Sequence, residues 1–225
     1  MTQTWHDLLF AHWAVDPVVL RARVPAALDL DVFENRAWIG IVPFRMSNVA
    51  PRGVPALPGI SAFPELNVRT YVRVGDKPGV FFFSLDAASA FAVGAARVMF
   101  GLPYYVAAMA LREDEGLTRY RSRRTAAGAP AELAAVYHPT GPVFHAARGS
   151  RDYFLTERYC LYTVDRRGRP HRLEIHHPPW PLQPASAAFE VLKMTEQIGV
   201  TLPAEPPVLH FARRQDVVAF PMTRA

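Results

Sequence analysis

Two adjacent tyrosines follow a Gly-Leu-Pro turn in the stretch FGLPYYVAAM, residues 100–109. They place two phenol hydroxyls among Phe, Leu, Val, Ala and Met neighbours. A buried phenol can donate a hydrogen bond to a carbonyl oxygen and act as a general acid. The alternative is that both rings pack in the core and bond to backbone groups. Because adjacent residues of an extended segment point to opposite faces, we expect at most one of Tyr104 and Tyr105 to enter a cavity.

Polar and apolar residues alternate in ELNVRTYVRV, residues 65–74, which predicts a strand with two different faces. One face carries Glu65, Asn67, Arg69, Tyr71 and Arg73. This polar face either meets solvent or lines a polar interior, as larger closed sheets allow. Glu65 is its acid–base candidate, and Arg69 and Tyr71 are its substrate-binding candidates, since a guanidinium fits a carboxylate. The alternative for Glu65 is a solvated carboxylate at a strand end, paired with Arg69 or Arg73.

Four further residues are substrate-binding candidates. Arg45 follows the bulge-prone Pro43, and we expect it to converge on the same place from a neighbouring strand. Glu157 and Arg158 stand together in TERY, where a buried ion pair explains them as well as ligand binding does. His177 is interpreted first as a buried, hydrogen-bonded histidine and second as a ligand contact.

Metal and cofactor sites have no support in the sequence. His176 and His177 are neighbours that diverge on a strand, and His171 lies six residues from His177, too far for joint ligation on a straight strand. The sequence contains no Gly-rich phosphate loop, HExxH or nucleophile elbow, so ATP, NAD and serine-hydrolase functions are not indicated. We therefore expect neither metal nor cofactor. Cys160, the single cysteine, is expected to be an inert core residue.

Composition bounds the setting and the partners. The 225 residues fit a single domain, 1–225, and one cysteine excludes an intrachain disulfide, which favours the cytoplasm. No apolar run reaches the ~20 residues that cross a bilayer, so no membrane association is expected. The net charge of +5 comes almost wholly from arginines, clustered at 119–124 and 165–172. We interpret both clusters as solvated side chains at strand ends and turns, and expect no nucleic-acid partner.

Short strands bounded by Pro and Gly dominate the rest of the chain. Segments 36–46, 65–74, 79–87 and 117–124 read as strands, 79–87 being apolar on both faces and therefore central. Residues 158–165 and 169–177 flank a turn and predict a hairpin, and 208–221 predicts a closing strand. Residues 88–100 and 184–199 predict helices, the second ended by Gly199. The fold class is therefore α+β, mainly antiparallel β, in a curled sheet or barrel.

Several segments, in order, resemble one known family: VPFRM, LPGISAFPELNVRTYV, GVFFFSLDA, GLPYY, FLTERYCLY and EIHHPPWPLQ. They are similar to the signature segments of the YqjF-like family of uncharacterised bacterial proteins, from about Trp5 to Phe220. That family is grouped with the acetoacetate decarboxylase-like superfamily. The resemblance implies an antiparallel β-barrel or cone around a pocket, with helices packed outside, and self-association as a homo-oligomer.

The decarboxylases carry a Gly-Phe-Pro-Lys-Lys motif whose first lysine forms a Schiff base with a β-keto acid. GLPYY resembles this motif, with Tyr104 at the position of the Schiff-base lysine, which favours Tyr104 over Tyr105 as the pocket residue. A phenol cannot form an imine, and neither Lys77 nor Lys193 stands in a promising context. Glu65 resembles the pocket glutamate of the decarboxylases.

Three functions stay open at this point. The first is a lyase-like enzyme that acts on a small anionic or carbonyl compound without a Schiff-base lysine, with Glu65 and Tyr104 as its catalytic pair. The second is a non-catalytic protein that binds or senses a metabolite in the same cavity. The third is a structural or interaction module with a solvated polar face, which predicts that Glu65 and Arg69 are exposed.

Overall fold

The structure, a computed structural model, describes residues 1–51, 53, 61–90, 93–94, 101–125 and 130–225. Strands dominate the described residues, and the helices among them are short. The strands are β1 (Thr2–Val15), β2 (Asp29–Leu30), β3 (Ala37–Ala50), β4 (Phe63–Val74), β5 (Lys77–Ala87), β6 (Tyr104–Asp114), β7 (Leu117–Arg124), β8 (Glu132–Pro139), β9 (Cys160–Val164), β10 (Pro170–His176), β11 (Gln183–Leu192) and β12 (Val208–Arg224). The helical segments are α1 (Pro17–Arg21), α3 (Arg151–Thr156) and the 3₁₀ turn η1 (Glu196–Ile198).

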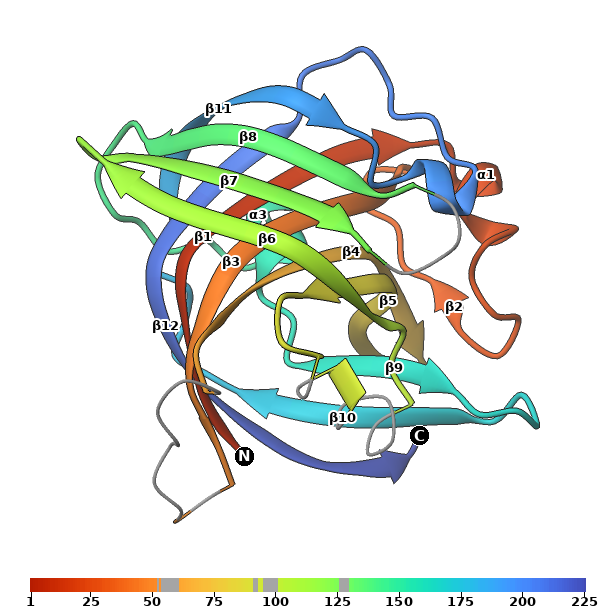
Figure 1. The fold of residues 1–225 in the computed structure, drawn as a ribbon. Coiled ribbons are helices and arrows are strands. Elements are labelled where there is room, and N and C mark those ends of the chain that lie inside the picture. The colour runs from red at the N-terminus through yellow and green to blue at the C-terminus, as the bar shows by residue number, and fades with distance from the viewer. Residues whose placement is uncertain (52, 54–60, 91–92, 95–100, 126–129) are drawn as a thin grey trace.

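The strands form one sheet that closes on itself (Figure 1). Its order is β10-β9-β5-β6-β7-β8-β11-β12-β1-β3-β4-β2, with additional pairings β10–β12 and β5–β4. These additional pairings close two rings of strands that share β12, β1, β3, β4 and β5. All pairs are antiparallel except β5–β6 and β5–β9, which are parallel. The expected class, mainly antiparallel β, is confirmed.

Most strand predictions agree with the structure. Segments 36–46, 65–74, 79–87 and 117–124 correspond to β3, β4, β5 and β7, and 208–221 lies within β12. β9 and β10 form the predicted antiparallel hairpin, with Leu173 opposite Leu161. β5 is central, because it pairs with β4, β6 and β9. Most of the helix predicted over 88–100, and most of the proline-rich segment before β4, lie outside the described residues.

The helix predicted over 184–199 is wrong, because most of this segment is strand β11 followed by η1. Along β11 exposure alternates with a period of two. Ala185, Ala187 and Phe189 pack against the main core, while Ser186 and Glu190 are exposed. Pairing with β8 and β12 satisfies the backbone of β11 and overrides the local helix preference. Gly199 does end η1, with a left-handed φ of 62°.

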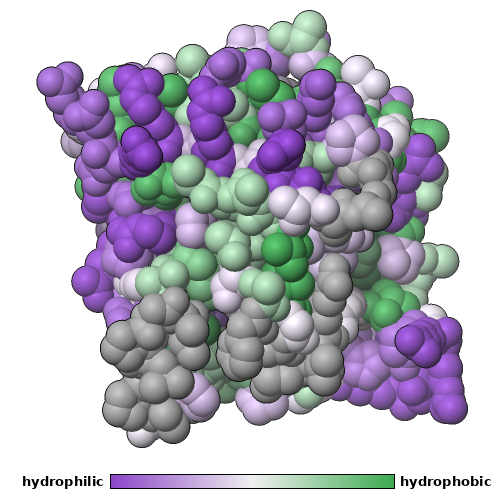
Figure 2. Space-filling model, in the orientation of Figure 1, coloured by the Kyte–Doolittle hydropathy of each residue, from purple (hydrophilic) through white to green (hydrophobic). Residues whose placement is uncertain are grey.

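The two arginine clusters are mostly solvated, as predicted, with one exception. The 165–172 cluster lies at the β9–β10 turn, and Figure 2 shows hydrophilic side chains there and over β7 and β8. Within β7, Arg119, Arg121 and Arg123 are exposed along one face. Arg124 is not solvated: its side chain is 5% exposed and forms an ion pair with Asp86, whose side chain is fully buried. The prediction of solvated arginines is therefore wrong for Arg124.

Two apolar clusters occupy opposite faces of the shared strands. The larger contains Leu9, Ile41 and Leu66, and it is the cluster against which β11 packs. The second contains Phe10, Phe44 and Trp180, and Tyr104 packs against it. The face of β4 that carries Glu65 looks toward this second cluster, since Phe44 is opposite Glu65 in the β3–β4 register. No helix in the described part of the chain is long and apolar enough to cross a membrane.

Candidate functional site

Glu65 and Tyr104 meet inside the protein, at the point where β4, β5 and β6 lie side by side. Glu65 is opposite Ala87 of β5, and Tyr104 is opposite Leu85 in the parallel β5–β6 pair. This register directs both side chains to the same face of the sheet. The Tyr104 hydroxyl donates a hydrogen bond to Oε2 of Glu65 at 3.0 Å. The two predicted catalytic residues are therefore in direct contact.

Burial controls the charge of this pair. Glu65 is only 2% exposed, and removal from water raises its pKa from 4.5 to about 8. The hydrogen bond from Tyr104 lowers the pKa, whereas the nearby carboxylate of Asp86 raises it. The pKa of Tyr104 lies well above its ordinary value, first because of burial and then because of Glu65. At neutral pH Glu65 is therefore mainly a neutral acid and Tyr104 a neutral phenol.

The second oxygen of Glu65 forms no hydrogen bond with the described part of the chain. No hydrogen bond joins Oε1 to another described residue, although Oε2 accepts from Tyr104. Two residues along the same face of β4, the side chain of Asn67 is 5% exposed, and its Oδ1 has no hydrogen-bond partner among the described residues. Phe44 and Ala87 supply apolar surface on either side. This face combines a neutral acid, an unsatisfied amide oxygen and apolar walls.

The burial of the β4 face decides whether its polar side chains meet solvent or the protein interior. Glu65, Asn67 and Tyr71 are 2%, 5% and 0% exposed. A solvated polar face is excluded for these residues. The exposure of Glu65 that the interaction-module hypothesis predicted is therefore wrong.

Arg69 and Tyr71 share this face but bind protein groups. The Tyr71 hydroxyl donates to the Leu155 carbonyl at 2.7 Å, and Nη2 of Arg69 donates to the same carbonyl at 3.1 Å. Tyr71 also contacts Nε2 of His12 at 2.7 Å. Both residues thus hold the last turn of α3 against the sheet. Nε of Arg69, by contrast, has no hydrogen-bond partner among the described residues.

Glu157 and Arg158 lie just after α3 and do not pair with each other. Oε1 of Glu157 accepts from the Trp180 backbone N–H at 2.9 Å, and Oε2 accepts from the Tyr159 hydroxyl. Arg158 instead forms an ion pair with Asp31, at 2.6 Å. Each buried charge is therefore satisfied by the protein and fixes a connecting segment.

His177 is buried and hydrogen-bonded, as its first interpretation proposed. Its Nδ1 lies 2.7 Å from the Pro178 carbonyl and 3.2 Å from Nε2 of Gln215. Its ring stacks on Tyr159 with centroids 4.6 Å apart. Burial lowers its pKa. Among the described residues no group of three or more metal-binding side chains is gathered, around His177 or elsewhere.

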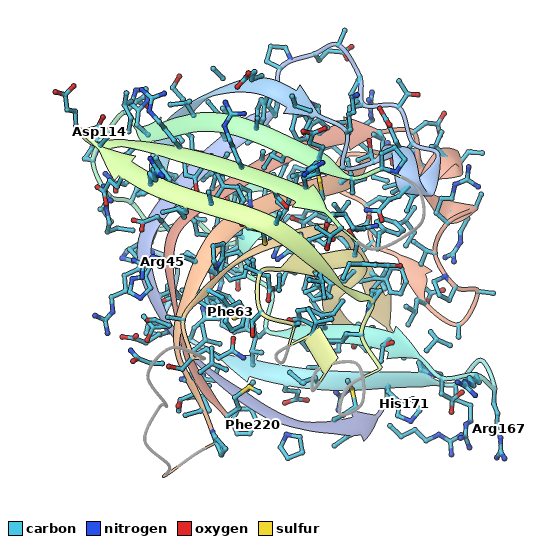
Figure 3. All side chains as sticks on the ribbon, in the orientation of Figure 1. Arg45, Phe63, Asp114, Arg167, His171 and Phe220 are labelled. Carbon is cyan, nitrogen blue, oxygen red and sulfur yellow. The ribbon has the colours of Figure 1, made fainter. Side chains whose placement is uncertain are left out.

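Arg45 and Tyr105 lie on the opposite face from Glu65. Phe44, not Arg45, is opposite Glu65, so Arg45 points the other way and forms an ion pair with Asp7 at 3.4 Å. In Figure 3 Arg45 lies at the left-hand margin of the molecule. Tyr105 is opposite Asp86, and its ring lies 3.8 Å below the Arg124 guanidinium carbon. The structure thus places Tyr104, and not Tyr105, beside Glu65.

Three buried polar residues of this region were not proposed as site residues from the sequence. They are Asn67, His12 and His210, all 5% exposed or less. Asn67 was assigned to the correct face by the alternation of β4. His12 lies in LFAHWAV, where a single histidine interrupts an apolar strand, and such an interruption is the signal that could have identified it.

Comparison with known proteins assigns the family. The model of DUF2071, described as "Uncharacterized conserved protein (COG2071)", matches residues 2–216. The chain belongs to the DUF2071 family. It is also 46% identical over 224 residues to the "Uncharacterized protein YqjF" of Bacillus subtilis (strain 168), a match that covers all of this chain and 92% of that protein. The predicted resemblance to the YqjF-like family is confirmed.

Solved structures show the same fold at low sequence identity. Acetoacetate decarboxylase from Legionella pneumophila matches with a TM-score of 0.65 and 14% identity, over 99% of this chain and 86% of that one. An acetoacetate decarboxylase-like enzyme from Sphingomonas wittichii RW1 matches with a TM-score of 0.64 and 13% identity, over 100% and 92%. The enduracididine biosynthesis enzyme MppR, complexed with pyruvate, matches with a TM-score of 0.65 and 11% identity, over 99% and 88%. The DUF2071 chain therefore has an acetoacetate decarboxylase-like fold.

Neither lysine of this DUF2071 protein lies beside Glu65. Lys77 forms an ion pair with Glu174, and both side chains are about two-fifths exposed, at 41% and 42%. Lys193 follows β11 and is exposed. A Schiff base needs a primary amine within reach of the bound carbonyl. At this site the group beside Glu65 is the phenol of Tyr104.

Proposed function

We propose that the protein is an enzyme that performs acid–base chemistry on a small carbonyl compound, without a Schiff base, using Glu65 and Tyr104. The observation that carries this proposal is the 3.0 Å hydrogen bond from Tyr104 to Oε2 of Glu65, which leaves Oε1 without a partner among the described residues. The pKa of about 8 supports a carboxyl that serves as acid below that pH and as base above it.

Each form of Glu65 has a role in this chemistry. In the neutral form, Oε1–H donates to the carbonyl oxygen of the ligand and polarises the C=O bond. In the ionised form, the carboxylate removes a proton from the carbon next to the carbonyl, and the electron pair of that C–H bond moves to form the enolate. Tyr104 holds Glu65 in position. Its hydroxyl donates to the Glu65 carboxylate or to the enolate oxygen of the ligand, depending on which of the two carries more negative charge. Enolisation, hydration and lyase steps share these requirements.

The positions of two arginines argue against a substrate that must be held by an arginine beside Glu65, and so favour an uncharged carbonyl group as the part that Glu65 contacts. Arg45 points to the opposite face, and Nη2 of Arg69 binds the Leu155 carbonyl. The fold neighbours are enzymes, and one of them was solved in complex with pyruvate, which carries a ketone carbonyl beside its carboxylate. These likenesses support the substrate class.

Hydrogen–deuterium exchange tests the proposal directly. The protein is incubated in deuterated buffer with acetoacetate, pyruvate and acetylacetone, and exchange of the hydrogens next to each carbonyl is followed by proton NMR. We expect catalysed exchange of at least one probe, with a rate that rises through about pH 8. Glu65→Gln should lower this rate by about 100-fold or more, since general bases contribute factors of that size.

The control is Arg73→Gln, at the exposed end of the same strand, which should leave exchange unchanged. Exchange that Glu65→Gln does not alter would contradict the proposed role of Glu65. Saturable binding of a probe without any exchange would instead support the alternative, a non-catalytic metabolite-binding protein that uses the same face.

A further inference from the structure

The buried side-chain nitrogens that have no hydrogen-bond partner among the described residues include Nδ1 of His12, Nδ1 of His210 and Nε of Arg69. His12 and His210 are 0% and 5% exposed. Neither histidine takes part in the chemistry proposed for Glu65 and Tyr104. The protein thus encloses hydrogen-bonding capacity that its own groups do not use.

The sheet places these three side chains on one face, around the ring of Phe10. His210 is opposite Phe10 in the β1–β12 register, and His12 lies two residues along β1 on the same face. The ring of Phe10 lies parallel to that of His12, with centroids 5.7 Å apart, and the Arg69 guanidinium carbon is 5.2 Å above the same Phe10 ring. Phe10 is therefore the common neighbour of all three groups.

Gly40 allows His12 and Arg69 to approach each other. His12, Gly40 and Arg69 lie in one row across β1, β3 and β4. A Cβ atom at position 40 would lie 3.0 Å from Cδ2 of His12 and 3.3 Å from Cγ of Arg69. A side chain at Gly40 would fill the space that the two residues now share.

The hydrogen-bond partners of each histidine determine what its free nitrogen offers. The single hydroxyl proton of Tyr71 goes to the Leu155 carbonyl, which can only accept, so Nε2–H of His12 donates to the Tyr71 oxygen. Burial lowers the pKa of His12 well below its usual value, which leaves a lone pair on Nδ1. Nε2 of His210 lies 3.4 Å from Oδ1 of Asp152, and this contact favours the tautomer that carries its proton on Nε2 and a lone pair on Nδ1. Nε of Arg69 is a donor.

We propose that His12, His210 and Arg69 form a second polar site, which binds a primary carboxamide group. The NH₂ of the amide donates to the two histidine Nδ1 atoms, and its carbonyl oxygen accepts from Nε–H of Arg69. A carboxylate has no hydrogens to donate and would meet two lone pairs. An ammonium group would meet the positive charge of Arg69. This site lies four residues along β4 from Glu65 and does not depend on the function proposed there.

Acetamide and acetate test the site, because they have the same shape and differ in the hydrogens that they donate. Histidine ring nitrogens of the ¹⁵N-labelled full chain are observed by long-range proton–nitrogen NMR while each compound is added. We expect acetamide to produce a saturable shift of both Nδ1 signals, and acetate to bind about tenfold more weakly or worse, since lone pairs facing carboxylate oxygens remain unsatisfied.

Variants assign the shift to the site. His210→Phe should abolish the acetamide response, and His176→Phe, at an exposed histidine of β10, should preserve it. If His210→Phe does not fold, the comparison of acetamide with acetate on the unmodified protein still tests whether the site prefers a carboxamide to a carboxylate. Equal binding of both compounds overturns the proposal, as does no shift with either. A crystal structure grown with acetamide that shows only an ordered water between the three nitrogens also overturns it.

Discussion

The hydroxyl of Tyr104 lies 3.0 Å from Oε2 of Glu65, on a face of β4 from which water is largely excluded. The bond joins two groups whose charged forms burial disfavours, since the pKa of each is raised. A phenol can donate to a carboxyl group in either of its protonation states. The pair is therefore stable as a neutral unit and also tolerates ionisation of Glu65 at higher pH.

Tyr104→Phe should raise the pKa of Glu65 above its value of about 8. The substitution removes the hydrogen bond that favours the carboxylate and keeps the ring that packs against the second apolar cluster. The rise should be about one pH unit, since a hydrogen bond to a charged group contributes about 1.5 kcal/mol. Carbon NMR of the labelled Glu65 carboxyl measures it, and an unchanged or lower pKa would show that the bond does not support the ionised form.

Glu65→Gln should stabilise the protein increasingly as the pH rises from about 4.5 to about 8. Below this window Glu65 is protonated in both the folded and the unfolded chain. Within it the unfolded chain loses the proton while the folded protein keeps it, so rising pH favours unfolding. Above about 8 both states are ionised and the penalty is constant.

Gln carries no such proton, so the difference in unfolding free energy between variant and wild type should grow across the window by about 5 kcal/mol. Urea unfolding at several pH values measures it. A difference that does not change with pH would mean that the folded and unfolded pKa values of Glu65 are alike.

The alternation of β4 was sufficient to group Glu65 with Asn67, Arg69 and Tyr71, because side chains of a strand alternate strictly. It could not show that Arg69 and Tyr71 bind the Leu155 carbonyl, since α3 lies far along the chain. The position of Arg45 depended on register. Phe44 rather than Arg45 is opposite Glu65. The residue pattern within either strand does not determine how the two strands align, so this pairing could not be predicted from it.

The error at 184–199 has a local cause. Ala, Glu, Leu, Lys and Met favour helices. Ala188 is exposed although it is apolar, so the sequence does not show a clear alternation of polar and apolar residues along β11. Hydrogen bonding to β8 and β12 decided the outcome, and those partners are distant in sequence. Tyr104 was favoured over Tyr105 by resemblance to a family motif, and the parallel β5–β6 register supplies the physical reason.

Tyr71→Phe should loosen α3 without changing the titration of Glu65. It removes the donor to the Leu155 carbonyl and leaves Nε2–H of the buried His12 without its acceptor. A buried unsatisfied group costs about 1–3 kcal/mol, so the unfolding free energy should fall by about that amount. Amide hydrogen exchange should accelerate in Arg151–Thr156.

Tyr153→Phe is the matched control on the same helix, because no hydrogen bond joins its hydroxyl to another described residue. It should leave exchange and stability near those of the wild type. If Tyr71→Phe also leaves α3 protected, Tyr71 does not anchor the helix, and its role as a ligand contact would need to be considered again.

Arg124→Met should destabilise the protein far more than Arg121→Met, although both arginines lie on β7. Arg124 pairs with Asp86, and the two side chains are 5% and 0% exposed, whereas Arg121 pairs with Glu190 at 69% and 68%. Loss of one partner of a buried pair leaves an uncompensated charge and costs about 3–5 kcal/mol. Loss of an exposed partner costs about 1 kcal/mol or less.

Arg124→Met in addition removes the cation above the Tyr105 ring and a hydrogen bond to Gln197 of η1. It should therefore also expose the amides of η1 to faster hydrogen exchange, an effect that Arg121→Met should not produce. Chemical unfolding of both variants measures the first difference. An unpaired carboxylate in the core would destabilise Arg124→Met far more than Arg121→Met. Equal losses of stability would therefore mean that a group other than Arg124 compensates the charge of Asp86.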